Sequence, residues 1–111
     1  MMKTYQVEIT KYAYKQMRDI ARYVKIKLKN PDAAEKLLND LKTAAISLEK
    51  MPHRIPLTDE QPWKSEGIRK MPVKNYLMYF WIDEIKSLVY ITAVIYGQRE
   101  QKRQLSKMEM Q

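Results

Sequence analysis

The sequence predicts an α+β domain in which a helix hairpin packs on one face of an antiparallel sheet of about four strands. Apolar and polar side chains alternate in residues 4–9, and residues 68–96 are rich in apolar and aromatic runs, as in β-strands. Residues 11–50 instead repeat apolar side chains every three or four positions, which is typical of amphipathic helices. The resulting order, β-α-α-β-β-β, predicts one domain spanning residues 1–111.

The N-terminal half predicts a strand followed by two helices. Residues 4–9 form a half-buried strand, and Thr10 is a suitable N-cap for a helix over 11–29. Asn30 and the proline after it interrupt this helix and begin a second one over 31–50, because proline fits the first helical turn. Almost no residues separate the two helices, so they are expected to fold back as an antiparallel hairpin.

A loop rich in proline connects the helices to the remaining strands. Residues 51–66 contain three prolines and the only histidine, His53. This histidine is more simply explained as a surface residue than as a general base. Trp63 is expected to anchor the loop on the core.

The C-terminal half predicts an antiparallel meander. Its strands cover 68–73, 76–82 and 88–96, joined by turns at 74–75 and 83–87. The strand at 76–82 is apolar on both faces, so it should lie centrally with both faces covered. Two helices cover only one face. The other face is therefore exposed, covered by the polar C-terminal tail as a short helix or loose segment, or occupied by a partner.

Composition restricts the possible functions. Lys and Arg number 21 against 13 Asp and Glu, a formal net charge of +8 with a pI near 9.6, which favours a polyanionic partner. Cysteine is absent, which excludes disulfides, zinc–thiolate sites and thiol nucleophiles and fits a reducing cytosol. No apolar run approaches the ~20 residues that span a bilayer. We therefore expect a cytoplasmic protein that has no membrane partner.

No familiar catalytic set is present. The chain has one histidine, two glycines and scattered acids, so neither a nucleophilic triad, a phosphate-binding glycine loop, a metal site nor a cofactor is expected. Six basic and aromatic residues remain as candidates: Arg69, Lys70, Lys74, Tyr76, Tyr96 and Arg99. If strand registers allow, Arg69 and Lys70 gather with Tyr96 and Arg99 at one sheet end.

Such a group has two interpretations. Cations beside tyrosines suit phosphate binding and base stacking. They could also support RNA cleavage by the 2′-hydroxyl, which needs a proton acceptor, a proton donor and stabilisation of charge at phosphorus. Alternatively, they are ordinary solvated charges on a basic protein.

The segment GIRKMPVKNYLMYFWIDEIKSLVYITAVIYGQRE, residues 67–100, closely resembles the C-terminal half of the RelE/ParE toxin superfamily. The shared features are an arginine in the first strand (Arg69), a tight turn into a strand led by Tyr76, an acidic hairpin, and a closing Tyr-Gly-x-Arg-Glu that contains Tyr96 and Arg99. The N-terminal half also fits, with a strand, two helices meeting at Asn-Pro, and a proline-rich loop ending in Pro-Trp.

The resemblance implies a toxin of a type II toxin–antitoxin system, neutralised by a cognate acidic antitoxin. It favours ribosome-dependent, metal-independent mRNA cleavage. The RelE branch cuts mRNA in the ribosomal A site, whereas the ParE branch poisons DNA gyrase without catalysis. A degenerate, non-toxic binding module is a third reading, because Leu77 and Gln98 stand where relatives often have basic residues.

For the mRNA-cleaving branch, the resemblance also implies roles for the candidate residues. The catalytic residues would be Arg69, Lys70 and Arg99. Lys74, Tyr76 and Tyr96 would bind RNA or another target.

Overall fold

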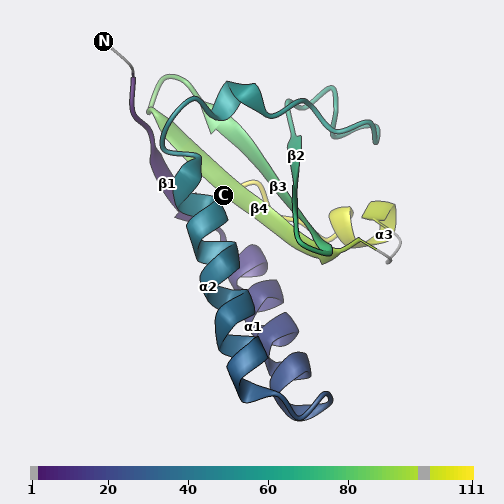
Figure 1. Ribbon diagram of the computed structural model, residues 1–111. Coiled ribbons are helices and arrows are strands. Elements are labelled where there is room, and N and C mark those ends of the chain that lie inside the picture. Colours follow the sequence, from purple (N-terminus) through teal and green to yellow (C-terminus); the bar gives the residue numbers. More distant parts are fainter. Residues whose placement is uncertain (1–2, 98–100) are drawn as a thin grey trace.

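The structure, a computed structural model, describes residues 3–97 and 101–111. It contains one four-stranded sheet in the order β1-β4-β3-β2, with the α1–α2 hairpin on one face (Figure 1). The elements in chain order are β1 (Gln6–Ile9), α1 (Lys11–Ile26), α2 (Pro31–Ser47), the short 3-10 helix η1 (Pro52–Arg54), β2 (Arg69–Val73), β3 (Tyr76–Asp83), β4 (Leu88–Tyr96) and α3 (Gln101–Leu105). This is the predicted α+β architecture.

Both helices begin at their predicted caps. The Thr10 hydroxyl accepts a hydrogen bond from the Ala13 amide at 3.2 Å, and the Asn30 side chain accepts one from Ala33 at 3.1 Å. The helix α1 ends three residues before its predicted end, because Lys29 adopts a left-handed conformation (φ 51°) that turns the chain into α2. In the described part of the chain, no helix is long and apolar enough to cross a membrane.

The C-terminal meander of β2, β3 and β4 is antiparallel, as predicted. The first strand differs from the prediction, because β1 pairs with β4 in parallel and the sheet is therefore mixed. Only strands joined by a tight turn must run antiparallel. Both helices and two strands separate β1 from β4 in the chain, so no such turn constrains this pair.

A β-bulge at Thr92 allows side chains on both sides of it in β4 to point into the core beneath the helices. Tyr79 pairs with Ala93, while the next residue of β3, Phe80, pairs with Ile91. The extra residue, Thr92, is fully buried, and its hydroxyl donates to the Tyr79 carbonyl at 3.4 Å. One inserted residue shifts the alternation by one. Ile91 and Val94 consequently both reach the core beneath the helices.

The second face of the sheet is covered by the chain's own C-terminal tail. Leu105 is fully buried there against Tyr79 and Ile95, with Met108 and Met110 packed around them. The Trp81 indole donates a hydrogen bond to the Met110 carbonyl at 2.7 Å. Trp63 of the proline-rich loop also packs on this face, as predicted. Of the three alternatives for this face, coverage by the tail is therefore the one realised.

This packing makes the tail part of the folded core. We expect Leu105→Ala to lower the free energy of unfolding by about 2–4 kcal/mol, because it leaves a cavity in a closed apolar cluster. Chemical denaturation followed by tryptophan fluorescence measures this change. The matched control, Ile85→Ala, alters a side chain that is 97% exposed and should leave stability unchanged. Equal stability of the two variants would contradict the packing of the tail.

Candidate functional site

Three of the predicted target-binding residues lie together at one end of the sheet. Tyr76 and Tyr96 are paired neighbours on β3 and β4, with ring centroids 5.6 Å apart and planes tilted by 57°. Lys74 lies in the β2–β3 turn, where it adopts a positive φ of 56°. The same turn is joined to the end of β4, because the Gly97 amide donates to the Asn75 carbonyl at 2.9 Å. We call this region the tyrosine end of the sheet.

Arg69 and Lys70 do not lie at the tyrosine end. Arg69 pairs with Phe80, four residues along β3 from the tyrosine end, which corresponds to about 13 Å. The prediction that these cations gather with Tyr96 is therefore wrong. In an antiparallel meander, the start of β2 lies beside the second half of β3. The end of β4 instead lies beside the start of β3. Arg99, the third predicted catalytic residue, lies outside the described residues.

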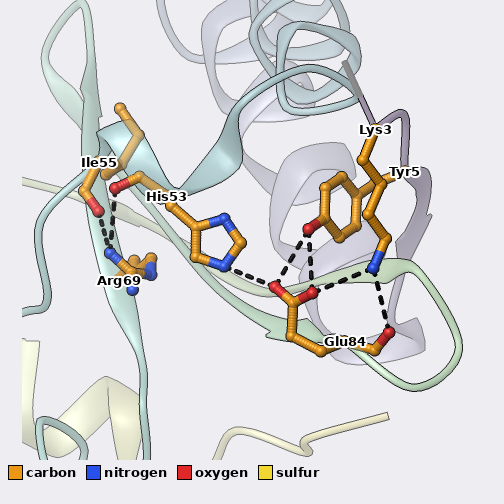
Figure 2. A network of polar contacts seen from close by, with 6 residues as sticks. All are labelled: Lys3, Tyr5, His53, Ile55, Arg69 and Glu84. Atoms are coloured by element: carbon orange, nitrogen blue, oxygen red, sulfur yellow. Dashed lines mark hydrogen bonds and ion pairs between the residues drawn. The ribbon is translucent and has the colours of Figure 1, made fainter. Parts of the chain in front are cut away.

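The Arg69 guanidinium is engaged by the loop that follows α2. Its Nη1 donates to the Ile55 carbonyl at 2.5 Å and to the His53 carbonyl at 3.4 Å (Figure 2). The two carbonyls belong to the loop between α2 and β2, which also forms a bridge to β2 between Leu57 and Arg69. Arg69 thus ties this segment to the first strand of the meander.

Lys70 is engaged by a carboxylate on the opposite face of the sheet. Its Nζ lies 3.1 Å from Oε1 of Glu60. The Tyr79 hydroxyl also donates to Oε1, and the Thr58 hydroxyl donates to Oε2 of the same carboxylate. Burial opposes ionisation of Glu60, but the hydrogen bonds from Thr58 and Lys70 outweigh it and lower its pKa. Burial, with the nearby Glu60, raises the pKa of Tyr79 well above its usual value.

His53 belongs to a second polar network, at the β3–β4 turn. Its Nε2 lies 2.6 Å from Oε1 of Glu84 (Figure 2). The Tyr5 hydroxyl also donates to Oε1, and the Lys3 ammonium donates to Oε2, each at 3.1 Å. The bond from Lys3 is the main cause of a lowered pKa of Glu84. The network joins the N-terminal segment, the proline-rich loop and the β3–β4 turn.

Sequence reasoning missed Glu60 and Glu84 as the partners of these groups. Both stand in irregular segments, where no periodic pattern indicates which way a side chain points. Their distances along the chain from Lys70 and from Lys3 also do not indicate that these groups form ion pairs. Only the folded arrangement brings each acid to its cation.

A groove of about 820 Å³ opens between α1 and the tyrosine end. Its walls include Asp19 and Tyr23 from α1, Leu28 from the turn that follows α1, and Tyr76 and Tyr96 from the sheet. Burial is the main cause of a raised pKa of Tyr76, and the neighbouring Tyr96 and Tyr23 raise it further. We call this cavity the tyrosine groove.

The described residues at the tyrosine end are better suited to binding than to proton transfer. Lys74, Tyr76 and Tyr96 provide one cation and two aromatic rings, and no histidine lines the groove. Within residues 3–97 and 101–111, no group of three or more His, Cys, Asp or Glu side chains could hold a metal ion. The described residues of this site can therefore make apolar contacts and hydrogen bonds with a partner, but they include no pair of side chains suited to general acid–base catalysis.

One comparison with known proteins identifies a family. The family described as the ParE toxin of the type II toxin–antitoxin system parDE matches residues 7–101. No curated protein sequence matches the chain significantly.

Solved structures share the fold at low sequence identity. The chromosomal ParDE toxin–antitoxin system of P. aeruginosa aligns with a TM-score of 0.71 at 14% identity, over 86% of this chain and 99% of the other. The RelBE2 toxin–antitoxin complex of Mycobacterium tuberculosis gives 0.65 at 18% identity, over 86% and 94%. A mutant of E. coli toxin RelE in the free state gives 0.63 at 15% identity, over 93% and 92%.

The Glu60 cluster predicts a specific acid sensitivity. The pKa of Glu60 lies below its usual value of 4.5, so its carboxylate stabilises the fold above that pH and loses this effect as the pH falls through the folded-state pKa. Glu60→Gln should lower stability at pH 7 by about 1–3 kcal/mol, because Lys70 then faces no charge. It should also flatten the loss of stability below pH ~4.5.

Urea denaturation between pH 7 and pH 3 measures both effects. Asp59→Asn, at an exposed neighbour in the same loop, is the matched control. An acid dependence that Glu60→Gln and Asp59→Asn change equally would show that the cluster does not carry it.

Proposed function

The chain belongs to the ParE toxin family of type II toxin–antitoxin systems, and we propose that it stops growth by binding DNA gyrase rather than by cutting mRNA. The observation that carries this proposal is the engagement of the two β2 cations. The Lys70 ammonium contacts the Glu60 carboxylate at 3.1 Å, and the Arg69 guanidinium donates to two loop carbonyls. Both are among the three residues that the sequence predicted to support cleavage; the third, Arg99, lies outside the described residues.

Chemistry at phosphorus would require these groups to be released. A general acid or base must reach the substrate proton, and a stabilising cation must face the developing charge. Moving Lys70 away would leave the Glu60 carboxylate, whose side chain is only 14% exposed, without its counter-charge. Tyr79 is fully buried, and this burial raises its pKa, which disfavours ionisation of its hydroxyl near neutral pH.

The helix hairpin offers a surface suited to a protein target. Four large apolar side chains on it are more than half exposed: Tyr23, Ile26, Leu28 and Ile46. The hairpin also extends past the sheet, so its tip is accessible from several sides (Figure 1). Exposed apolar residues concentrated on one protruding element are typical of an interaction site.

An antitoxin is the second partner in this proposal. Two of the solved structures with this fold are toxin–antitoxin systems. The formal charge of +8 favours an acidic antitoxin, because charge complementarity speeds association and selects the partner.

Ribosome-dependent mRNA cleavage is the alternative function. The position of Lys74 beside Tyr76 and Tyr96 favours it, since one cation and two aromatic rings suit a phosphate and a stacked base. In this alternative, Arg99 would have to supply the charge stabilisation.

Two assays distinguish the functions. Expression in a bacterial host without an antitoxin should arrest growth and induce the DNA-damage response. The purified protein should inhibit supercoiling by gyrase while translation in a cell-free system continues. Messenger RNA cut within codons, together with normal supercoiling, would overturn the proposal in favour of cleavage. Harmless expression would indicate a degenerate binding module.

The hairpin surface gives a variant test. Ile26→Lys should weaken gyrase inhibition by about tenfold or more, because it places a charge in an apolar contact. The control Ile85→Lys, on the β3–β4 turn at the other side of the fold, should inhibit as the parent does. Equal inhibition by both variants, with circular dichroism confirming that both are folded, would exclude the hairpin as the contact surface.

A further inference from the structure

The two sides of α1 carry grooves of opposite charge. Among the described residues that line the tyrosine groove, Asp19 alone is charged. A shallower groove of about 540 Å³ lies around Ile9 and Tyr14, and its three charged side chains, Lys11, Lys15 and Arg18, are all basic. We call it the basic groove. By their lining residues, an anionic group is therefore attracted more strongly to the basic groove than to the side of the tyrosine groove formed by Asp19.

The walls of the tyrosine groove combine aromatic rings with a carboxylate. Tyr76 and Tyr96 meet at 5.6 Å with their planes tilted by 57°, so their faces form an angled corner. Tyr23 approaches from α1, where 57% of its surface is exposed. The amide oxygen of Gln16 is already occupied, since it accepts a hydrogen bond from the Val94 amide at 2.8 Å.

Rings from three elements and one carboxylate are the groups that bind an organic cation. The face of an aromatic ring carries partial negative charge and attracts ammonium or guanidinium groups. A carboxylate adds charge-assisted hydrogen bonds, which are strongest with the two parallel N–H groups of a guanidinium. A planar guanidinium also stacks on tyrosine, which the compact ammonium of lysine does not.

We propose that the tyrosine groove binds one arginine side chain of the antitoxin, stacked on the tyrosines and paired with Asp19. This inference rests on the proposed toxin function, which supplies the antitoxin as the partner. Such a partner would place carboxylates in the basic groove on one side of α1 and its arginine in the tyrosine groove on the other side. It can therefore bind in only one register. The alternating charge thereby gives specificity, because a shifted chain would place like charges together.

A small-molecule titration of the full chain tests the groove directly. The probes are N-acetyl-arginine methylamide and the corresponding citrulline compound, which has the same shape but no charge. We expect the arginine probe to shift the NMR amide signals of Asp19, Tyr23, Tyr76 and Tyr96. The citrulline probe should bind about fivefold more weakly, the ratio expected for losing one partly exposed cation contact.

Matched variants locate the contacts. Asp19→Asn and Tyr23→Leu should each weaken binding of the arginine probe by about fivefold. Their controls are Asp59→Asn, an exposed acid in the proline-rich loop, and Tyr14→Leu, an exposed tyrosine on α1 that lines the basic groove. Both controls should bind the probe as the parent does. Circular dichroism confirms the fold of each variant.

Three results would overturn the inference. They are equal binding of the two probes, shifts centred on the basic groove, and tighter binding of guanosine monophosphate than of the arginine probe at the same residues. The last result would make the groove a nucleotide site. Failure here with supercoiling still inhibited leaves the proposed target intact. Arginine binding without gyrase inhibition overturns the proposed target instead.

Discussion

The need to cover both faces of β3 and β4 determines the architecture. Side chains of β3 alternate between two apolar clusters, with Met78 and Phe80 beneath the helices and Tyr79 on the opposite face. A sheet apolar on both sides is stable only as the middle layer of a sandwich. The hairpin provides one cover. The C-terminal tail covers the other face through Leu105. The strand ends and the outer surface of the hairpin are therefore the surfaces that stay accessible to partners.

Two acids in irregular segments complete the fold of a strongly basic chain. Glu60 binds Lys70, and Glu84 binds Lys3 and His53, so each acid holds a loop or turn against the sheet. Exposed pairs contribute little individually, but a carboxylate that accepts several hydrogen bonds fixes the position of every donor. The basic residues near the start of β2 therefore stabilise the packing of the loop on the sheet. They lie away from the tyrosine end.

Local patterns in the sequence predicted the helices and strands, but they did not predict how strands distant in the chain pair with one another. A nearly continuous apolar run located β4 at 88–96, and the two caps located both helix starts, because neighbouring residues determine these features. The parallel pairing of β1, the bulge at Thr92 and the position of Arg69 depend on strand register. Register is set by how both apolar faces fit together, so no window of sequence contains it. The grouping of Tyr76 with Tyr96 likewise comes from the folded register, which pairs the start of β3 with the end of β4.

The position of the tyrosine groove suggests how an antitoxin would act on this fold. Tyr23 and Leu28 line the groove and also belong to the exposed apolar surface of the hairpin. A partner anchored in the groove would therefore cover residues that the proposed target contacts. Neutralisation would then follow from occlusion alone and would need no change in the toxin's conformation. It would also explain why a chain with so many cations keeps one acid, Asp19, on this face of α1: the acid selects the partner that covers the hairpin.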